Sequence, residues 1–118
     1  MSKDKLKNDP DTWQKTLTDI LHKNALLKYM LSEIVDENED KNFLPTAEYF
    51  QNELLLNDEK VRILIKEVNE FEAMFLRDCD EKYKQKYEKL EHEILDFKKN
   101  YHAFSRNFKL KCYKKAID

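Results

Sequence analysis

The sequence predicts an all-α protein, built from an antiparallel helical hairpin and a long C-terminal helix. Its 118 residues contain no glycine, and proline occurs only at Pro10 and Pro45. Apolar residues make up 41% of the chain, enough for one core, and they recur at spacings of three and four. Folds rich in tight turns draw on glycine for positive φ angles. A few long helices in one domain, residues 1–118, are therefore the simplest arrangement.

The first helix is predicted over about residues 10–36. Asp9 suits the N-cap and Pro10 the first helical position, so residues 1–8 are expected to be flexible. The helix then carries a seam at alternating spacings of four and three, which is a heptad pattern: Trp13, Leu17, Ile20, Asn24, Leu27, Leu31 and Ile34. The seam ends in an acidic connection at residues 37–44.

The second helix is predicted over about residues 45–77, beginning at Pro45. Its seam contains Ala47, Phe50, Leu54, Asn57, Val61, Leu64, Val68, Phe71 and Phe75. If the two helices fold back on each other, Asn24 falls opposite Asn57. An asparagine in an apolar seam lowers stability unless its amide finds a partner, so we predict that these two residues pair and set the register. The alternative is that both amides reach solvent at the edge of the bundle.

The third helix is predicted over about residues 79–115. Its seam is Cys79, Tyr83, Tyr87, Leu90, Ile94, Phe97, Tyr101, Phe104 and Phe108. From Phe71 to Tyr87 the spacings are all four, which has two interpretations. Either the chain turns near Asp78, as an N-cap, and forms a three-helix bundle, or one continuous helix over 46–115 contains a stutter. The continuous helix would need a second chain, in a domain-swapped antiparallel dimer.

The sequence predicts no enzyme. Phosphate-binding loops and nucleophile elbows need glycine. Glu88, His92 and Asp96 share one helix face, but it is the outer, solvated face, so no metal or cofactor is predicted. Cys112 lies among lysines, Lys109, Lys111 and Lys115, a setting that can lower a thiol pKa, but it has no evident catalytic partner. No small-molecule substrate is evident.

The location predicted from the sequence is cytoplasmic. No apolar run is long enough to span a bilayer, and the first residues show no secretory signal. Two cysteines, Cys79 and Cys112, fit free thiols in a reducing compartment.

Charge is unevenly distributed along the chain. Residues 98–118 hold seven lysine and arginine side chains against one aspartate, a net charge of +6, whereas the whole chain carries -2. Basic side chains interleaved with aromatic ones suit single-stranded nucleic acid, and the same pattern suits an anionic membrane surface. However, Tyr101, Phe104 and Phe108 continue the third seam, so they are predicted to lie in the core.

Topology favours a third interpretation, in which the basic end of the third helix lies near an acidic counter-patch. That patch comprises Glu33, Asp36, Glu37, Glu39 and Asp40. Within the predicted basic tail, 109–118, the residues expected to face a partner are Lys109, Leu110, Lys111, Tyr113, Lys114 and Lys115. We predict a protein that acts by protein–protein interaction, with itself or with a helical partner. Nucleic-acid binding through 98–115 is the alternative, and anionic membrane association is the third.

Overall fold

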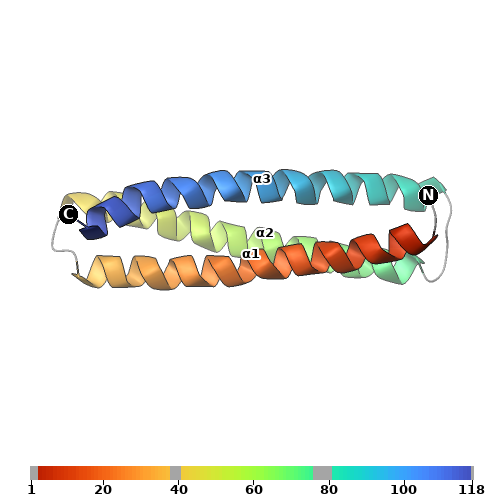
Figure 1. Ribbon diagram of the computed structural model, residues 1–118, viewed down its shortest axis with the longest axis horizontal. Coiled ribbons are helices and arrows are strands. Elements are labelled where there is room, and N and C mark those ends of the chain that lie inside the picture. The colour runs from red at the N-terminus through yellow and green to blue at the C-terminus, as the bar shows by residue number, and fades with distance from the viewer. Residues whose placement is uncertain (1–2, 38–40, 76–80, 118) are drawn as a thin grey trace.

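Three long helices lie side by side in an up-down-up bundle (Figure 1). The computed structural model describes the backbone of residues 3–37, 41–75 and 81–117, and the side chains of 10–37, 41–74 and 81–112. The elements are α1 (Lys3–Glu37), the short 3₁₀ helix η1 (Lys41–Phe43), α2 (Leu44–Phe75) and α3 (Glu81–Ile117). The described part of the chain contains no strand. The bundle is a rod of 58 × 18 × 17 Å.

The structure selects the three-helix bundle over the continuous 46–115 helix. The helix α2 ends at Phe75, α3 begins at Glu81, and α3 runs back along both other helices of the same chain (Figure 1). The aromatic stripe of α3 is therefore covered without a second chain. The proposed cap Asp78 and the seam residue Cys79 lie outside the described residues.

The predicted start of the first helix is wrong. The helix α1 begins at Lys3, and Pro10 lies inside it. The backbone of residues 3–8 is therefore helical rather than a separate segment, and Asp9 is not an N-cap. A proline inside a helix removes one hydrogen bond and crowds the carbonyl four residues earlier, here that of Leu6. The side chain of Pro10 is buried in the bundle, which offsets part of that cost.

The start of α2 agrees with the prediction to within one residue. Pro45 is its second residue, where the missing N–H has no helical partner to lose. Just before α2, Phe43 of η1 is buried. Sequence analysis missed Phe43, although it continues the second seam backwards by four residues. At the other terminus α3 extends to Ile117, so the predicted tail at 109–118 is helical through 117.

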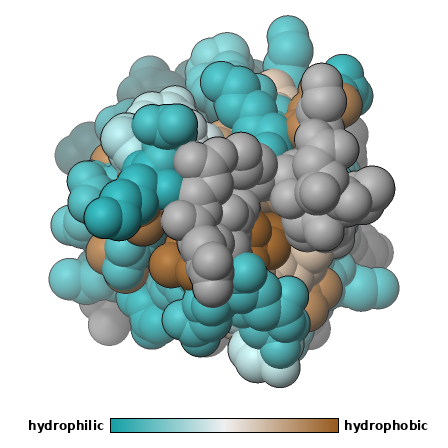
Figure 2. Space-filling view, turned by 90° about the vertical axis from the view of Figure 1, so that its left-hand side faces the viewer, coloured by the Kyte–Doolittle hydropathy of each residue, from teal (hydrophilic) through white to brown (hydrophobic). Residues whose placement is uncertain are grey.

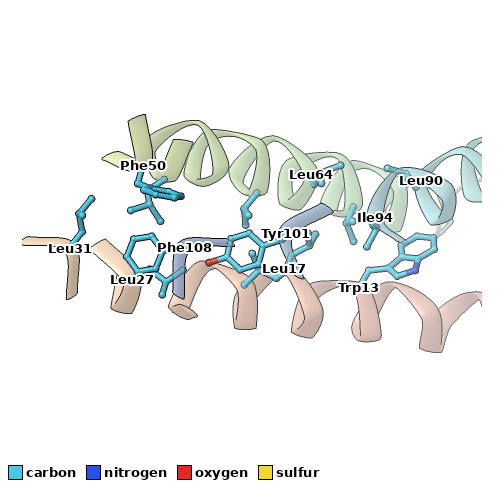
Figure 3. Close-up of a cluster of buried hydrophobic side chains, with 14 of the residues drawn as sticks. Trp13, Leu17, Leu27, Leu31, Phe50, Leu64, Leu90, Ile94, Tyr101 and Phe108 are labelled. Carbon is cyan, nitrogen blue, oxygen red and sulfur yellow. The ribbon is translucent and has the colours of Figure 1, made fainter. Parts of the chain in front are cut away.

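The three predicted seams form one core (Figure 3). Every predicted seam residue of α1 is buried. Partial exposure is confined to Asn57, Phe97 and Phe104 among the seam residues of α2 and α3 whose side chains are described. The prediction of an all-α bundle with one core is confirmed.

Aromatic rings cluster in two parts of this core. Near the pole where α2 ends and α3 begins, the Trp13 ring lies 5.2 Å from Tyr87 and 5.8 Å from Phe71, which stacks on Tyr83 at 4.2 Å. We call Trp13, Phe71, Tyr83 and Tyr87 the Trp13 cluster. Toward the opposite pole, Phe50 lies 5.3 Å from Phe108 and 6.0 Å from Phe104.

Candidate interaction surfaces and a buried polar layer

A polar layer crosses the core between the two aromatic regions, centred on the fully buried Asn24. Its Nδ2 donates to the backbone oxygen of Leu54 and to Oδ1 of Asp58, each at 2.7 Å. Its Oδ1 accepts a hydrogen bond of 3.2 Å from the hydroxyl of Tyr101. Asn24 therefore lies level with residues 54–58 of α2, as the predicted hairpin register requires.

The direct hydrogen bond expected between Asn24 and Asn57 is not formed. Both N–H groups of Asn24 are directed elsewhere, and Nδ2 of Asn57 is buried without a hydrogen-bond partner among the described residues. The adjacent Asp58 takes the role expected of Asn57, because a carboxylate is a stronger acceptor than an amide. The alternative in which Asn24 reaches solvent is also wrong. That Asn24 and Asn57 set the register stays a prediction.

The layer continues outward from Asp58 to Lys28, which form an ion pair at the surface between α1 and α2. On its inner side, burial raises the pKa of Tyr101 to about 12, so the hydroxyl stays protonated and can donate. Lys28 and Asp58 were not predicted from the sequence. The sequence signal for this ion pair was the presence of opposite charges beside the first and second seams, close in sequence to Asn24 and Asn57.

The basic segment, residues 98–115, contributes Tyr101, Phe104 and Phe108 to the core, as predicted. Tyr101 and Phe108 are buried, and Phe104 is partly buried against them. Buried rings cannot stack on bases. Cys112 is also buried, and burial raises the pKa of its thiol to about 11. The expectation that neighbouring lysines lower this pKa is therefore wrong, because desolvation dominates.

The cationic side chains of the same helix remain on its outer side. A basic row of exposed residues begins at the adjacent Lys98 and Lys99 and continues from Lys99 at spacings of three and four along α3, through His102, Arg106 and Lys109. No aspartate or glutamate occurs from Phe97 to Ile117. The described part of this surface can therefore attract anions by charge alone.

The described residues of the predicted partner surface and of its predicted acidic counter-patch lie in the segments 109–111 and 33–37, near one pole of the rod (Figure 1), which Figure 2 views end-on. Lys109, Leu110 and Lys111 are exposed, as are Glu33, Asp36 and Glu37. The side chains of Tyr113, Lys114, Lys115, Glu39 and Asp40 lie outside the described residues. Among described side chains the ion pairs are Lys28–Asp58 and Lys89–Glu93, so none joins the two groups.

An open groove of about 450 Å³ lies between α1 and α2 near the same pole. Leu31, Ala47 and Leu54 of the core form its floor, and the half-exposed Leu44 and Leu55 stand on its α2 side. Its rim is polar, formed by Lys28, Ser32, Asp36, Glu48 and Gln51. The groove is therefore shallow, apolar at its base and partly acidic at its edge.

A second apolar surface runs along the outside of α2. Tyr49, Leu56 and Ile63 are 54%, 50% and 51% exposed and follow one another at intervals of seven residues. Since the a and d positions of α2 from Ala47 to Phe71 stay buried, apart from the partly exposed Asn57, residues at a constant heptad position stay on one outer line. We call these three residues the α2 row. Sequence analysis missed it, although a seven-residue apolar interval outside the seam was the signal.

The remaining candidates form no site. Glu88, His92 and Asp96 are all exposed, on the outer face that the seam assigned to them. Across residues 3–37, 41–75 and 81–117 no group of three His, Cys, Asp or Glu side chains could hold a metal ion. In the same part of the chain no helix is long and apolar enough to cross a membrane.

Comparison with known proteins adds no relative to this description. No family model, no curated protein and no solved structure matches the chain.

Proposed function

We propose that this chain is a non-enzymatic helical protein that acts through protein–protein contact, with a second copy or with a helical partner. The α2 row carries the proposal. The bundle already encloses a core of more than twenty apolar side chains, yet Tyr49, Leu56 and Ile63 remain half-exposed in one line. A line of exposed apolar side chains at one heptad position is typical of a helix-binding face.

One further feature fits this proposal. Leu110, near the end of α3, is another exposed apolar side chain. The proposal includes coiled-coil-like packing of the three seams and a cytoplasmic location. The location is supported by the free, buried thiol of Cys112.

The test compares the wild-type chain with the Leu56→Ser variant. We expect wild-type protein to self-associate, or to retain another protein during mild purification from its native source, and Leu56→Ser to lose that association. Leu55→Ser is the matched control, since Leu55 is 54% exposed on the same helix but points toward the α1/α2 groove. If neither self-association nor a row-dependent partner is found, the proposal fails.

A second candidate function rests on the basic row of α3. Five exposed lysine, arginine and histidine side chains, on a stretch of α3 from Phe97 to Ile117 that contains no carboxylate side chain, favour a phosphate-bearing partner. Because Tyr101 and Phe108 are buried and Phe104 is partly buried, contact would be made by charge and not by base stacking on these rings. We expect binding to DNA or RNA to fall steeply with salt and to disappear when Lys98, Lys99, Arg106 and Lys109 become Glu. Binding to anionic vesicles with the same dependence would identify a membrane surface, and no binding at low salt to either would reject the candidate.

A further inference from the structure

We infer that the partner of the α2 row is a second copy of this chain, packed antiparallel about a two-fold axis at Leu56. This inference rests on the proposed function and names its partner. Residues Tyr49 and Ile63 lie seven positions on either side of Leu56, roughly 10.5 Å each along a helix. A two-fold axis at Leu56 therefore sets Leu56 against its own copy, and sets Tyr49 of each copy against Ile63 of the other.

The charged residues beside the α2 row of one copy are complementary to those of the second copy when the same two-fold axis is applied. Glu53 and Lys60 occupy equivalent heptad positions on one flank of the row, halfway between its members. In an antiparallel pair of helices, equivalent flanking positions meet across the interface, so Glu53 of each copy meets Lys60 of the other. Within the described chain neither residue takes part in an ion pair. The two charges are thus available for contacts between copies.

The surface beside Ile63 can accommodate Tyr49 of the second copy, which the two-fold axis places there. An open groove of about 270 Å³ between α2 and α3 is walled by Ile63, Leu64 and Phe97. Its rim carries carboxylates, those of Glu67, Glu93 and Asp96. The ring of Tyr49 from the second copy can pack on the apolar wall, and its hydroxyl can donate to a rim carboxylate. A tyrosine seated in a partner's groove is a frequent source of binding energy in interfaces.

The extent of the row predicts a reversible dimer. Three half-exposed side chains span only roughly 21 Å of helix, at the small end of specific protein interfaces. A helical partner with basic flanks is the competing occupant, since the rim carries an excess of carboxylates. Such a partner would leave the symmetric spacing of Tyr49, Leu56 and Ile63, and of Glu53 and Lys60, without a role.

Sedimentation velocity across a range of protein concentrations tests the inference on the full chain. We expect wild-type protein to form a dimer that dissociates on dilution. Leu56→Ser should weaken the dimer by at least about tenfold, as expected for a central interface residue, whereas Leu55→Ser should leave it unchanged. Circular dichroism checks that each variant folds, and substitutions at these exposed positions are not expected to alter the bundle.

Charge exchange tests the axis itself. Glu53→Lys and Lys60→Glu should each weaken the dimer, because each sets like charges against one another at two symmetric sites. The double variant Glu53→Lys/Lys60→Glu should recover much of the lost affinity. Arg62→Glu is the control, because it makes the same change in net charge as Lys60→Glu two residues away, at a heptad position on the α1 side of the row.

Three outcomes would overturn the inference. They are a wild-type monomer at every concentration, equal effects of Leu56→Ser and Leu55→Ser, or a double charge variant no better than the single ones. If the chain is monomeric but binds another protein through Leu56, the antiparallel dimer is rejected and the proposed function stands. If the chain is monomeric and binds no protein through Leu56, the dimer and the proposed function are both rejected.

Discussion

The Trp13 cluster and the Asn24 layer are both buried between the same three helices, but they stabilise the bundle in different ways. The Trp13 cluster joins α1, α2 and α3 by ring contacts of 4.2 to 6.1 Å. Such contacts depend on buried area, and they tolerate small displacements along the helices. The Asn24 layer joins the same helices by directional hydrogen bonds to Leu54, Asp58 and Tyr101. We expect it to add less stability but to distinguish one register from another.

Removal of a ring from the Trp13 cluster should have the largest effect on stability. Phe71 is fully buried and contacts the rings of Trp13, Tyr83 and Tyr87. Phe71→Ala should lower the free energy of unfolding by about 3–5 kcal/mol, measured by urea unfolding. Leu55→Ala, at an exposed position of the same helix, should change it by less than about 0.5 kcal/mol. A similar small loss for Phe71→Ala would show that this cluster does not dominate the core.

Replacement of Asn24 by leucine should have a smaller effect, of about 1–3 kcal/mol. The substitution leaves the buried hydroxyl of Tyr101 without its acceptor, and it removes a donor from Asp58. Tyr101→Phe should therefore cost less in the Asn24→Leu background than in the wild type, and a double-mutant cycle measures the difference. Additive effects, or an unchanged stability and helix register in Asn24→Leu, would contradict a specifying role for this layer.

Alkaline pH should weaken the half of the core that contains Tyr101 and Cys112. Burial raises their pKa values to about 12 and about 11, from 10.0 and 9.0. Between each pair of values the unfolded chain loses a proton that the folded chain retains, so the free energy of unfolding falls as pH rises. The fall is at most about 1.4 kcal/mol per pH unit for each group, and below these ranges neither group contributes a pH dependence. Urea unfolding as a function of pH measures it, and Tyr101→Phe should flatten the slope above about pH 10.

Loss of the outer ion pair should have the smallest effect. Lys28 is about one-third exposed where it contacts Asp58, and such pairs contribute roughly 0 to 1 kcal/mol. Lys28→Met should lower the free energy of unfolding within that range, and the loss should shrink at high salt. Lys89→Met, at the more exposed pair with Glu93, is the comparison and should have no greater effect. A larger loss for Lys28→Met would mean that the hydrogen bond between Asp58 and Asn24 depends on the ion pair with Lys28.

The sequence predicted the core well because apolar periodicity reports burial directly. All three seams, the buried position of Tyr101 and Phe108, and the helix start near Pro45 follow from spacing and from backbone chemistry. The start of α1 could not be predicted in this way. The cap signal at Asp9 and Pro10 is local, and it was outweighed by continuation of the helix to Lys3.

The polar layer and the surfaces were harder to predict, because they depend on which side chain reaches across a helix. A seam pattern places Asn24 and Asn57 at one level, but it does not show that Asp58 lies within hydrogen-bond reach of Asn24. The α2 row was visible as a seven-residue interval at Tyr49, Leu56 and Ile63. Its significance depends on the closed core behind it, which only the structure shows.

The number of helices in the bundle determines where the chain enters and where it leaves. With three helices, the first residues of α1 and the last residues of α3 lie at opposite poles (Figure 1), on a rod 58 Å long. A bundle with an even number of helices would return the chain to the pole where it began. Anything joined to the two ends of this bundle is therefore held apart by nearly the full length of the rod, in a direction that the bundle fixes.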